Sequence, residues 1–308
     1  MAEGAVLTKP DDSTLTAQQY ACVRKEAERA LRDAGALGIL PTPVNNILEV
    51  ARVEEVPEPV LSESFIAKMR TKAGASLKRA LSKIRGLFHA SAGLIFLDQT
   101  LHAVKKRFVR LHEAGHGFLP WQRTMYAVVE DCDKSLDPEA AELFDREANV
   151  FASEVLFQLD TFREMALAQP FSIWVPIRLS KKFNASIYSS IRNYVSKSDR
   201  CCAVIVTEMP EISPDDGFRA TLRRAVQSPT FTERFGRYSW ADSYTPDDEI
   251  GAMIPVGPRR SSGIREIILI DRNGDPHECV AEAFTQTYQV FILIHVVKSL
   301  TTPSIVVP

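Results

Sequence analysis

Two histidines four residues apart, His112 and His116, most constrain what this chain can fold into. On an α-helix, four residues turn the chain through about 400°, so the two imidazoles leave the same face one turn apart, with Glu113 beside them. Apolar residues recur around this segment in steps of three and four, which predicts an amphipathic helix that ends at Pro120. The residues of this apolar stripe are Leu101, Val104, Phe108, Leu111 and Gly115.

Two imidazoles and a carboxylate on one helical turn are typical of a site for a divalent metal ion. The histidines lie beside the apolar stripe, so we expect them at the edge of the core rather than in bulk water. The alternative is a pair of histidines satisfied by ordinary hydrogen bonds. A catalytic zinc takes three protein ligands and leaves a fourth position for water, so the metal hypothesis requires one more ligand.

A second helix is predicted after Asp137 and Pro138, a typical N-cap residue followed by a proline at the first helical position. From Glu139 to about Phe162 the chain has neither proline nor glycine, so we expect one continuous helix over that range. Its apolar residues share about one third of the helical wheel. They are Phe144, Ala148, Phe151, Val155 and Phe162.

Glu147 is the predicted third ligand, because it lies at the edge of that apolar face and a buried carboxylate needs a cation or strong donors. Glu142 and Asp145 are predicted to point away. Glu154 is the second choice, as a ligand or as an acceptor that orients a histidine. The alternative for Glu147 is a salt bridge to an arginine. The arginines considered for that salt bridge are Arg110 and Arg123.

The two helices resemble those of the ImmA/IrrE metallo-endopeptidases. This family has a Phe-x-x-x-His-Glu-x-Gly-His helix and then a helix that reads Glu-Ala-Asn-x-Phe-Ala; residues 108–116 and 147–152 carry the same letters. A Pro-rich turn at 40–43 and a strand region at 86–98 are also similar, so the resemblance covers about residues 15 to 160. The sequence departs from the family at 156–158, where many members have Met-Pro, which leaves the subfamily open.

The resemblance implies a zincin-like fold in which His112, His116 and Glu147 hold zinc (Zn²⁺) or manganese (Mn²⁺). Glu113 is then the general base, which takes a proton from metal-activated water and later delivers it to the leaving amine. The implied activity is cleavage of a specific protein, a transcriptional repressor, within a stress response. Three residues are open candidates for the donor that stabilises the oxyanion. They are Tyr126, Arg123 and His102.

Residues 166–200 are predicted to form a helix-turn-helix-like connector, with Asn184 in the turn and Ser186 as the N-cap of the second helix. Six Lys or Arg against one acid between residues 170 and 200 give a local charge of +5, so DNA is a possible partner through residues 173–196. The alternative is a helical hairpin that only supports the fold. The residues expected on its outer face are Tyr188, Ser189, Arg192 and Asn193.

This segment supports a rival hypothesis from another functional class, a DNA-binding transcriptional regulator whose metal site is structural or vestigial. The intact Glu113 argues against the rival, because a structural metal site needs no base. A second basic stretch, Lys68–Arg85, holds seven Lys or Arg and no acid. We interpret it as a helix with a solvated cationic face, or as one wall of a cleft for an acidic partner.

The length of 308 residues suggests two domains, and the mixed helix and strand patterns predict the α+β class. We expect a zincin-like domain over residues 1–165, the connector over 166–200, and over 201–308 a C-terminal α+β domain that could sense a signal. Within that last domain, 201–208 is predicted as a strand. A hairpin with an Asn-Gly turn is predicted over 266–284, and irregular loops over 210–258.

Composition is that of an ordinary globular chain, with 45% hydrophobic residues and a formal charge of −2, which predicts no global attraction to nucleic acid. The N-terminus has no basic-then-apolar signal, and the longest apolar run, Val290–Val297, is too short to cross a bilayer, so no membrane partner is expected. Five cysteines, an odd number without a Cys-x-x-Cys pair, are typical of a reducing compartment. The expected location is therefore the cytoplasm.

Overall fold

A computed structural model describes the chain, which folds into two compact units. Unit 1 takes the chain up to Phe162 together with Lys181–Ser186, and unit 2 takes Arg163–Ser180 and the chain from Ile187 onward. The domain boundaries at residues 165 and 200 stay predictions, and the basic stretch Lys68–Arg85 lies outside the described residues. The described residues are 14–56, 86–89, 93–97, 101–131, 136–213 and 217–300.

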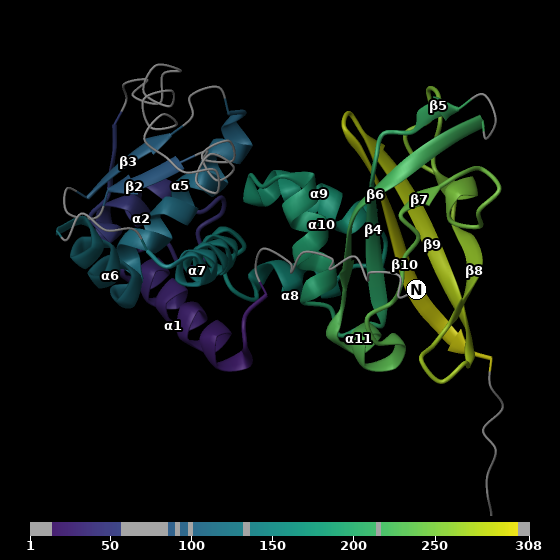
Figure 1. Cartoon of the computed structure of the whole chain (residues 1–308), viewed down its shortest axis with the longest axis horizontal. Helices are drawn as coiled ribbons and strands as arrows, with labels where there is room; N and C mark the ends of the chain where they lie inside the picture. Colours follow the sequence, from purple (N-terminus) through teal and green to yellow (C-terminus); the bar gives the residue numbers. More distant parts are fainter. Residues whose placement is uncertain are drawn as a thin grey trace, which may run out of the picture. The chain divides into compact units, whose positions relative to one another are not determined.

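Unit 1 combines helices with a small sheet in the order β1-β3-β2, where β1 runs parallel and β2 antiparallel to β3 (Figure 1). Helix α5 packs against β2 and β3 as well as against α2, α6 and α7. The elements are α1 (Ala17–Asp33), α2 (Val44–Ala51), β1 (Glu54–Glu55), β2 (Gly86–His89), β3 (Leu94–Leu97), α5 (Ala103–Phe118), α6 (Pro120–Asp131) and α7 (Pro138–Leu156).

Helix α7 begins as the sequence predicts, because the Asp137 carboxylate accepts hydrogen bonds from the first backbone N–H groups and Pro138 follows it. It ends at Leu156, however, so the expectation of one helix to Phe162 is wrong. A tertiary contact causes the break. The buried Gln158 amide accepts a hydrogen bond from Gly38 N and donates to Ala36 O and Thr42 Oγ1. The backbone of Gln158 has a positive φ of 54°. A separate helix, α8, follows over Thr161–Leu167.

Helices α5 and α7 approach closely because Gly115 has no side chain. A Cβ at Gly115 would lie 3.1 Å from Phe151 Cδ1 and 3.4 Å from Ala148 Cα, both on α7. Phe151 is fully buried, and its ring centroid lies 5.7 Å from that of Phe118. This close approach brings the histidine-bearing face of α5 against α7.

We expect Gly115→Val to lower the free energy of unfolding by about 1–3 kcal/mol, because its side chain overpacks the contact with Phe151. The same displacement of α5 from α7 should weaken binding of zinc at His112. Urea denaturation and zinc competition would measure the two effects. Gly263→Val is the control, since nothing lies within 4 Å of a Cβ there. Equal stability of both variants would show that the helices do not depend on this approach.

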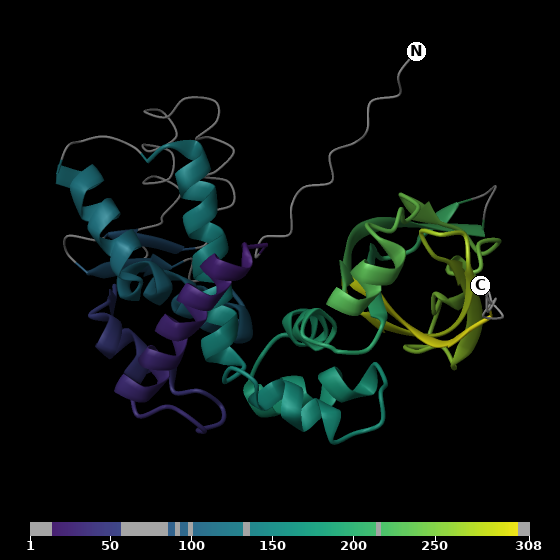
Figure 2. The same cartoon turned by 90° about the horizontal axis from the view of Figure 1, so that it is seen from below.

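Unit 2 holds a strongly curved antiparallel sheet in the order β5-β6-β4-β10-β9-β8, with β7 paired to β6 (Figure 2). Its core is formed by residues of β4, β8, β9 and β10 and by aromatic residues of α11. Its elements, with α9 extending to Phe183, are α9 (Trp174–Phe183), α10 (Ile187–Ser196), β4 (Cys202–Glu208), β5 (Glu211–Ser213), β6 (Gly217–Gln227), α11 (Pro229–Phe235), β7 (Ser243–Tyr244), η1 (Gly251–Met253), β8 (Arg265–Ile270), β9 (Pro276–Gln286) and β10 (Gln289–Ser299).

Several predictions for this part of the chain are confirmed. β4 and the β8–β9 hairpin lie where β-branched residues and the Asn-Gly turn place them, and Asp271 accepts hydrogen bonds from Asn273 N and Asp275 N in that turn. The apolar run at 290–297 is part of β10. The prediction of irregular loops over 210–258 is wrong, because β6 runs for 11 residues and pairs with β4.

Helices α9 and α10 are joined at Asn184, whose positive φ of 49° makes the predicted turn. The predicted outer face of the second helix is wrong in part, because α10 packs against β4 and β6. Asn193 is buried there, and the Tyr188 ring lies 6.4 Å from the ring of Phe291. Tyr188, Ser189 and Arg192 are partly exposed, and DNA binding through residues 173–196 stays a prediction. None of the helices in the described part of the chain is both long and apolar enough to cross a membrane.

Candidate metal centre

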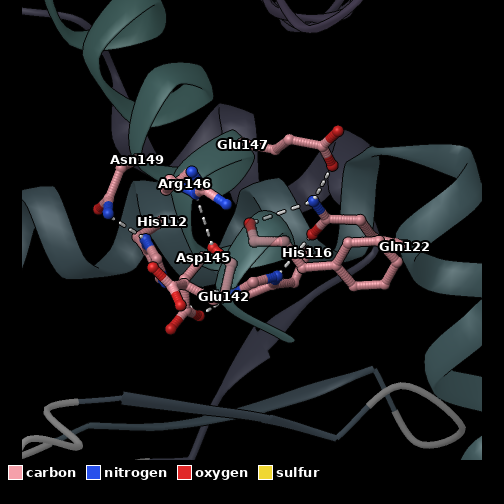
Figure 3. Close-up of polar contacts among 9 residues, drawn as sticks. His112, His116, Gln122, Glu142, Asp145, Arg146, Glu147 and Asn149 are labelled. Carbon is pink, nitrogen blue, oxygen red and sulfur yellow. Dashed lines mark hydrogen bonds and ion pairs between the residues drawn. The ribbon is translucent and has the colours of Figure 1, made fainter. Parts of the chain in front are cut away.

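The two histidines of α5 meet where the sequence predicts. Nε2 of His112 and Nε2 of His116 lie 3.1 Å apart, and the rings are perpendicular with centroids 4.7 Å apart (Figure 3). His116 is buried, and the His112 side chain is 17% exposed. The pair therefore lies at the edge of the core, with His112 partly exposed to solvent.

Each histidine is held by an amide at its other ring nitrogen. Nδ1 of His112 lies 3.0 Å from Asn149 Oδ1 on α7, and Nδ1 of His116 lies 2.6 Å from Gln122 Oε1 on α6. An amide oxygen only accepts, so both Nδ1 atoms carry the proton and both Nε2 atoms keep a lone pair. Two lone pairs that face each other at 3.1 Å repel unless a cation lies between them.

The carboxylate closest to this pair is Asp145, not Glu147. Asp145 Oδ1 lies 3.9 Å from Nε2 of His112 and 3.8 Å from Nε2 of His116, and its side chain is 66% exposed. Among the described residues these three side chains form a group that could hold a metal ion. The prediction that Asp145 points away is wrong, because α7 turns Asp145 and Asn149, one helical turn apart, toward α5.

Glu147 instead faces α6. Its Oε2 accepts hydrogen bonds from Trp121 Nε1 at 2.7 Å and from Gln122 Nε2 at 2.6 Å. These donors, rather than Arg110 or Arg123, satisfy the buried carboxylate. Arg110 pairs with Glu55.

Glu154 lies on another side of α7. Tyr20 Oη donates to it at 2.6 Å and Arg24 at 3.0 Å, so this buried carboxylate ties α7 to α1. Both donors come from α1, whereas the histidines lie on α5. Glu154 is therefore a structural residue rather than part of the histidine site.

The donor set fits a divalent metal of the zinc type. Two nitrogens bound at about 2.05 Å in a tetrahedral site lie about 3.3 Å apart, close to the 3.1 Å between the imidazoles. Burial lowers the pKa of His112 to about 4; burial and then the neighbouring imidazole lower that of His116 to about 3. Both rings are thus neutral near pH 7, which is the form that binds metals. Two imidazoles and a carboxylate also accept Mn²⁺.

Glu113 follows His112 on the same turn of α5 and is buried. Burial, and then the charge of Asp145, raise its pKa to about 8 in the metal-free protein. A cation a few ångströms away would lower that pKa again, because opposite charge favours the ionised carboxylate. A carboxylate whose pKa lies near neutrality suits a group that both accepts and returns a proton.

Of the three oxyanion candidates, the structure brings Tyr126 to the site. Its ring lies edge-on to His116 with centroids 5.3 Å apart, and burial raises its pKa, so the hydroxyl stays protonated. Arg123 donates to the backbone oxygens of Ala51 and Gly117. His102 is the exposed N-cap residue of α5, about 15 Å along the helix from His112.

Residues 69–189 match the family model of the IrrE N-terminal-like domain, peptidase family M78. The resemblance to the ImmA/IrrE family is thereby confirmed, and the match supports a metallopeptidase-type domain that uses a metal ion.

No curated protein matches the chain. Among solved structures it is similar to a Mycobacterium tuberculosis transcriptional regulator, with 12% sequence identity and a TM-score of 0.47 over 91% of this chain and 80% of that one.

Sequence reasoning missed or misplaced three residues of the candidate site. They are Gln122, Asp145 and Asn149. The spacing of Asp145 and Asn149 could have indicated their place. They are four residues apart, as His112 and His116 are, so each pair lies on one face of its helix, and two packed helices can turn these faces toward each other. No sequence pattern indicates Gln122, because its contacts depend on how α6 packs against α7.

Proposed function

We propose that this chain is a zinc-dependent endopeptidase that hydrolyses a peptide bond in one specific protein, a transcriptional repressor. The observation that carries the proposal is the 3.1 Å distance between the two Nε2 atoms, with each ring held by an amide oxygen at Nδ1. A site for hydrogen bonding alone would not direct two acceptors at each other. The match to the IrrE N-terminal-like domain supports peptidase chemistry.

His112, His116 and Asp145 would hold the ion, with Glu147 as the alternative third ligand that the family resemblance implies. A divalent cation there supplies Lewis acidity, which polarises the scissile carbonyl and acidifies water. Glu113 accepts the proton of the attacking water and delivers it to the nitrogen of the leaving amine. No covalent bond forms between the substrate and the protein.

The proposal is tested by adding purified, zinc-loaded protein to a soluble extract of cells that lack it, and identifying new protein N-termini by mass spectrometry. We expect a few cleavage sites in one protein or a small set, lost after chelation and restored by zinc. Elemental mass spectrometry should find close to one equivalent of metal. Protein that holds no metal even after zinc loading would contradict the proposal and favour the DNA-binding regulator.

Tyr126→Phe should lower kcat about 10²-fold, the typical cost of losing one donor to an oxyanion, while KM and bound zinc stay unchanged. The reason is that the Tyr126 ring packs edge-on to the ring of His116 and its hydroxyl stays protonated. The cleavage rate on the substrate identified above is the measurement. Tyr188→Phe, which removes a hydroxyl from α10, is the control. A Tyr126→Phe protein as fast as wild type would assign the oxyanion donor elsewhere.

A further inference from the structure

Gln122 is fully buried, and its amide contacts three groups. Its Nε2 donates to Glu147 Oε2 at 2.6 Å and to Phe144 O at 3.2 Å, and its Oε1 lies 2.6 Å from His116 Nδ1. Because two acceptors surround the nitrogen, the amide has one orientation that satisfies every partner. The oxygen must face the imidazole, and His116 must carry its proton on Nδ1.

Glu147 holds that amide in place. One carboxylate oxygen, Oε2, accepts both from Gln122 and from the neighbouring Trp121, and the Glu147 side chain is buried. Hydrogen bonds to an ionised acceptor are roughly twice as strong as neutral ones. The negative charge also polarises the Gln122 amide, which makes its oxygen a better acceptor for His116.

We infer that Gln122 and Glu147 are positioning residues that act on His116: the carboxylate fixes the amide, and the amide fixes the tautomer and ring orientation of the imidazole. This arrangement resembles the carboxylate–histidine pairs behind zinc ligands, with an amide inserted between the two groups. It rests on the proposed metal site for its effect on binding, but the tautomer is a property of the metal-free protein. In Figure 3 the Glu147 carboxylate meets the Gln122 amide rather than the histidine rings, so Glu147 would serve the site through Gln122.

The two histidines are supported differently. His112 contacts Asn149 on α7, the helix that also carries Asp145, whereas His116 depends on α6 through Gln122. Removing Gln122 should therefore free the ring of His116 and leave His112 in place. That asymmetry distinguishes a positioning role from a general loss of stability.

The test uses the full chain with ¹⁵N-labelled histidine. Long-range ¹H–¹⁵N spectra of the metal-free protein report which nitrogen of each ring is protonated, and competition with a chromophoric chelator measures affinity for Zn²⁺ alone. The variants are Gln122→Ala, Glu147→Gln and a matched control, Gln158→Ala. Gln158 is also a buried glutamine of the same unit with three amide contacts, but none of these three is to a histidine.

For Gln122→Ala we expect loss of the single Nδ1–H tautomer at His116 but not at His112, with Zn²⁺ affinity lowered about 10–100-fold. Glu147→Gln keeps an acceptor but removes the charge, so the tautomer should persist while affinity falls about tenfold. Gln158→Ala should change neither readout.

Two results would overturn the inference. The first is a His116 tautomer unchanged in Gln122→Ala; the second is Zn²⁺ binding abolished in Glu147→Gln but retained in Asp145→Asn, which would make Glu147 a ligand. If wild type binds no Zn²⁺ while the tautomer still changes in Gln122→Ala, the proposed function fails and the positioning role stands.

Discussion

Glu113→Gln should cut its protein substrate about 10²–10⁴-fold more slowly than wild type, the usual contribution of a general base. Glutamine has the same shape but cannot take a proton from water, and Glu113 lies beside the imidazoles rather than among the ligand atoms that group together. Bound zinc should therefore stay near one equivalent. Initial rates of appearance of the new N-terminus, measured with equal amounts of zinc-loaded protein, give the ratio.

Glu142→Gln is the matched control for Glu113→Gln, because Glu142 is an exposed carboxylate on α7. It should leave the rate unchanged. A Glu113→Gln protein that cleaves at the wild-type rate would remove Glu113 from the mechanism. Loss of zinc together with activity would show instead that Glu113 supports the metal site.

His116→Ala and Asp145→Asn should each weaken Zn²⁺ binding by about 10²–10³-fold. The reason is that the binding free energy typical of a zinc site, roughly 10–16 kcal/mol, is shared among about four ligands. Asparagine keeps the shape of Asp145 but removes the charge that faces both Nε2 atoms. Chelator competition on the full chain measures the change.

His102→Ala is the control for these ligand variants, because His102 is an exposed histidine at the start of the same helix and lies outside the group. The comparison that decides the third ligand is Asp145→Asn against Glu147→Gln. Loss of binding in the first with a small change in the second supports Asp145. The reverse would show that Glu147 leaves Trp121 and Gln122 to reach the ion.

Much of the α5 site depends on local chain geometry and could therefore be predicted. The spacing of His112 and His116 places their rings together on any α-helix, and Glu113 follows from the same turn. Asp137 likewise caps α7 because the first N–H groups of a helix need acceptors wherever the helix lies. Such features require no knowledge of distant contacts.

Distant contacts explain the predictions that were wrong. The helix expected through Phe162 ends early because the Gln158 side chain forms hydrogen bonds with the segment 36–42, which lies more than a hundred residues earlier in the sequence. β6 forms in a segment that has weak strand signals because β4 offers it a partner. Asn193 is buried because α10 lies on the sheet. Propensity is a weak prior where such tertiary contacts compete.

The sequence by itself determined the histidine pair, the position of Glu113 beside it and the helix that presents them, because a spacing of four residues has one consequence on an α-helix. Only the tertiary structure decided which carboxylate accompanies the pair. Helix α7 packs against α5 where Gly115 meets Phe151, in a rotation about its own axis that turns Asp145 toward the imidazoles and Glu147 toward Gln122. Two residues along a helix differ by about 200° in direction, so this rotation gives the two carboxylates separate contacts.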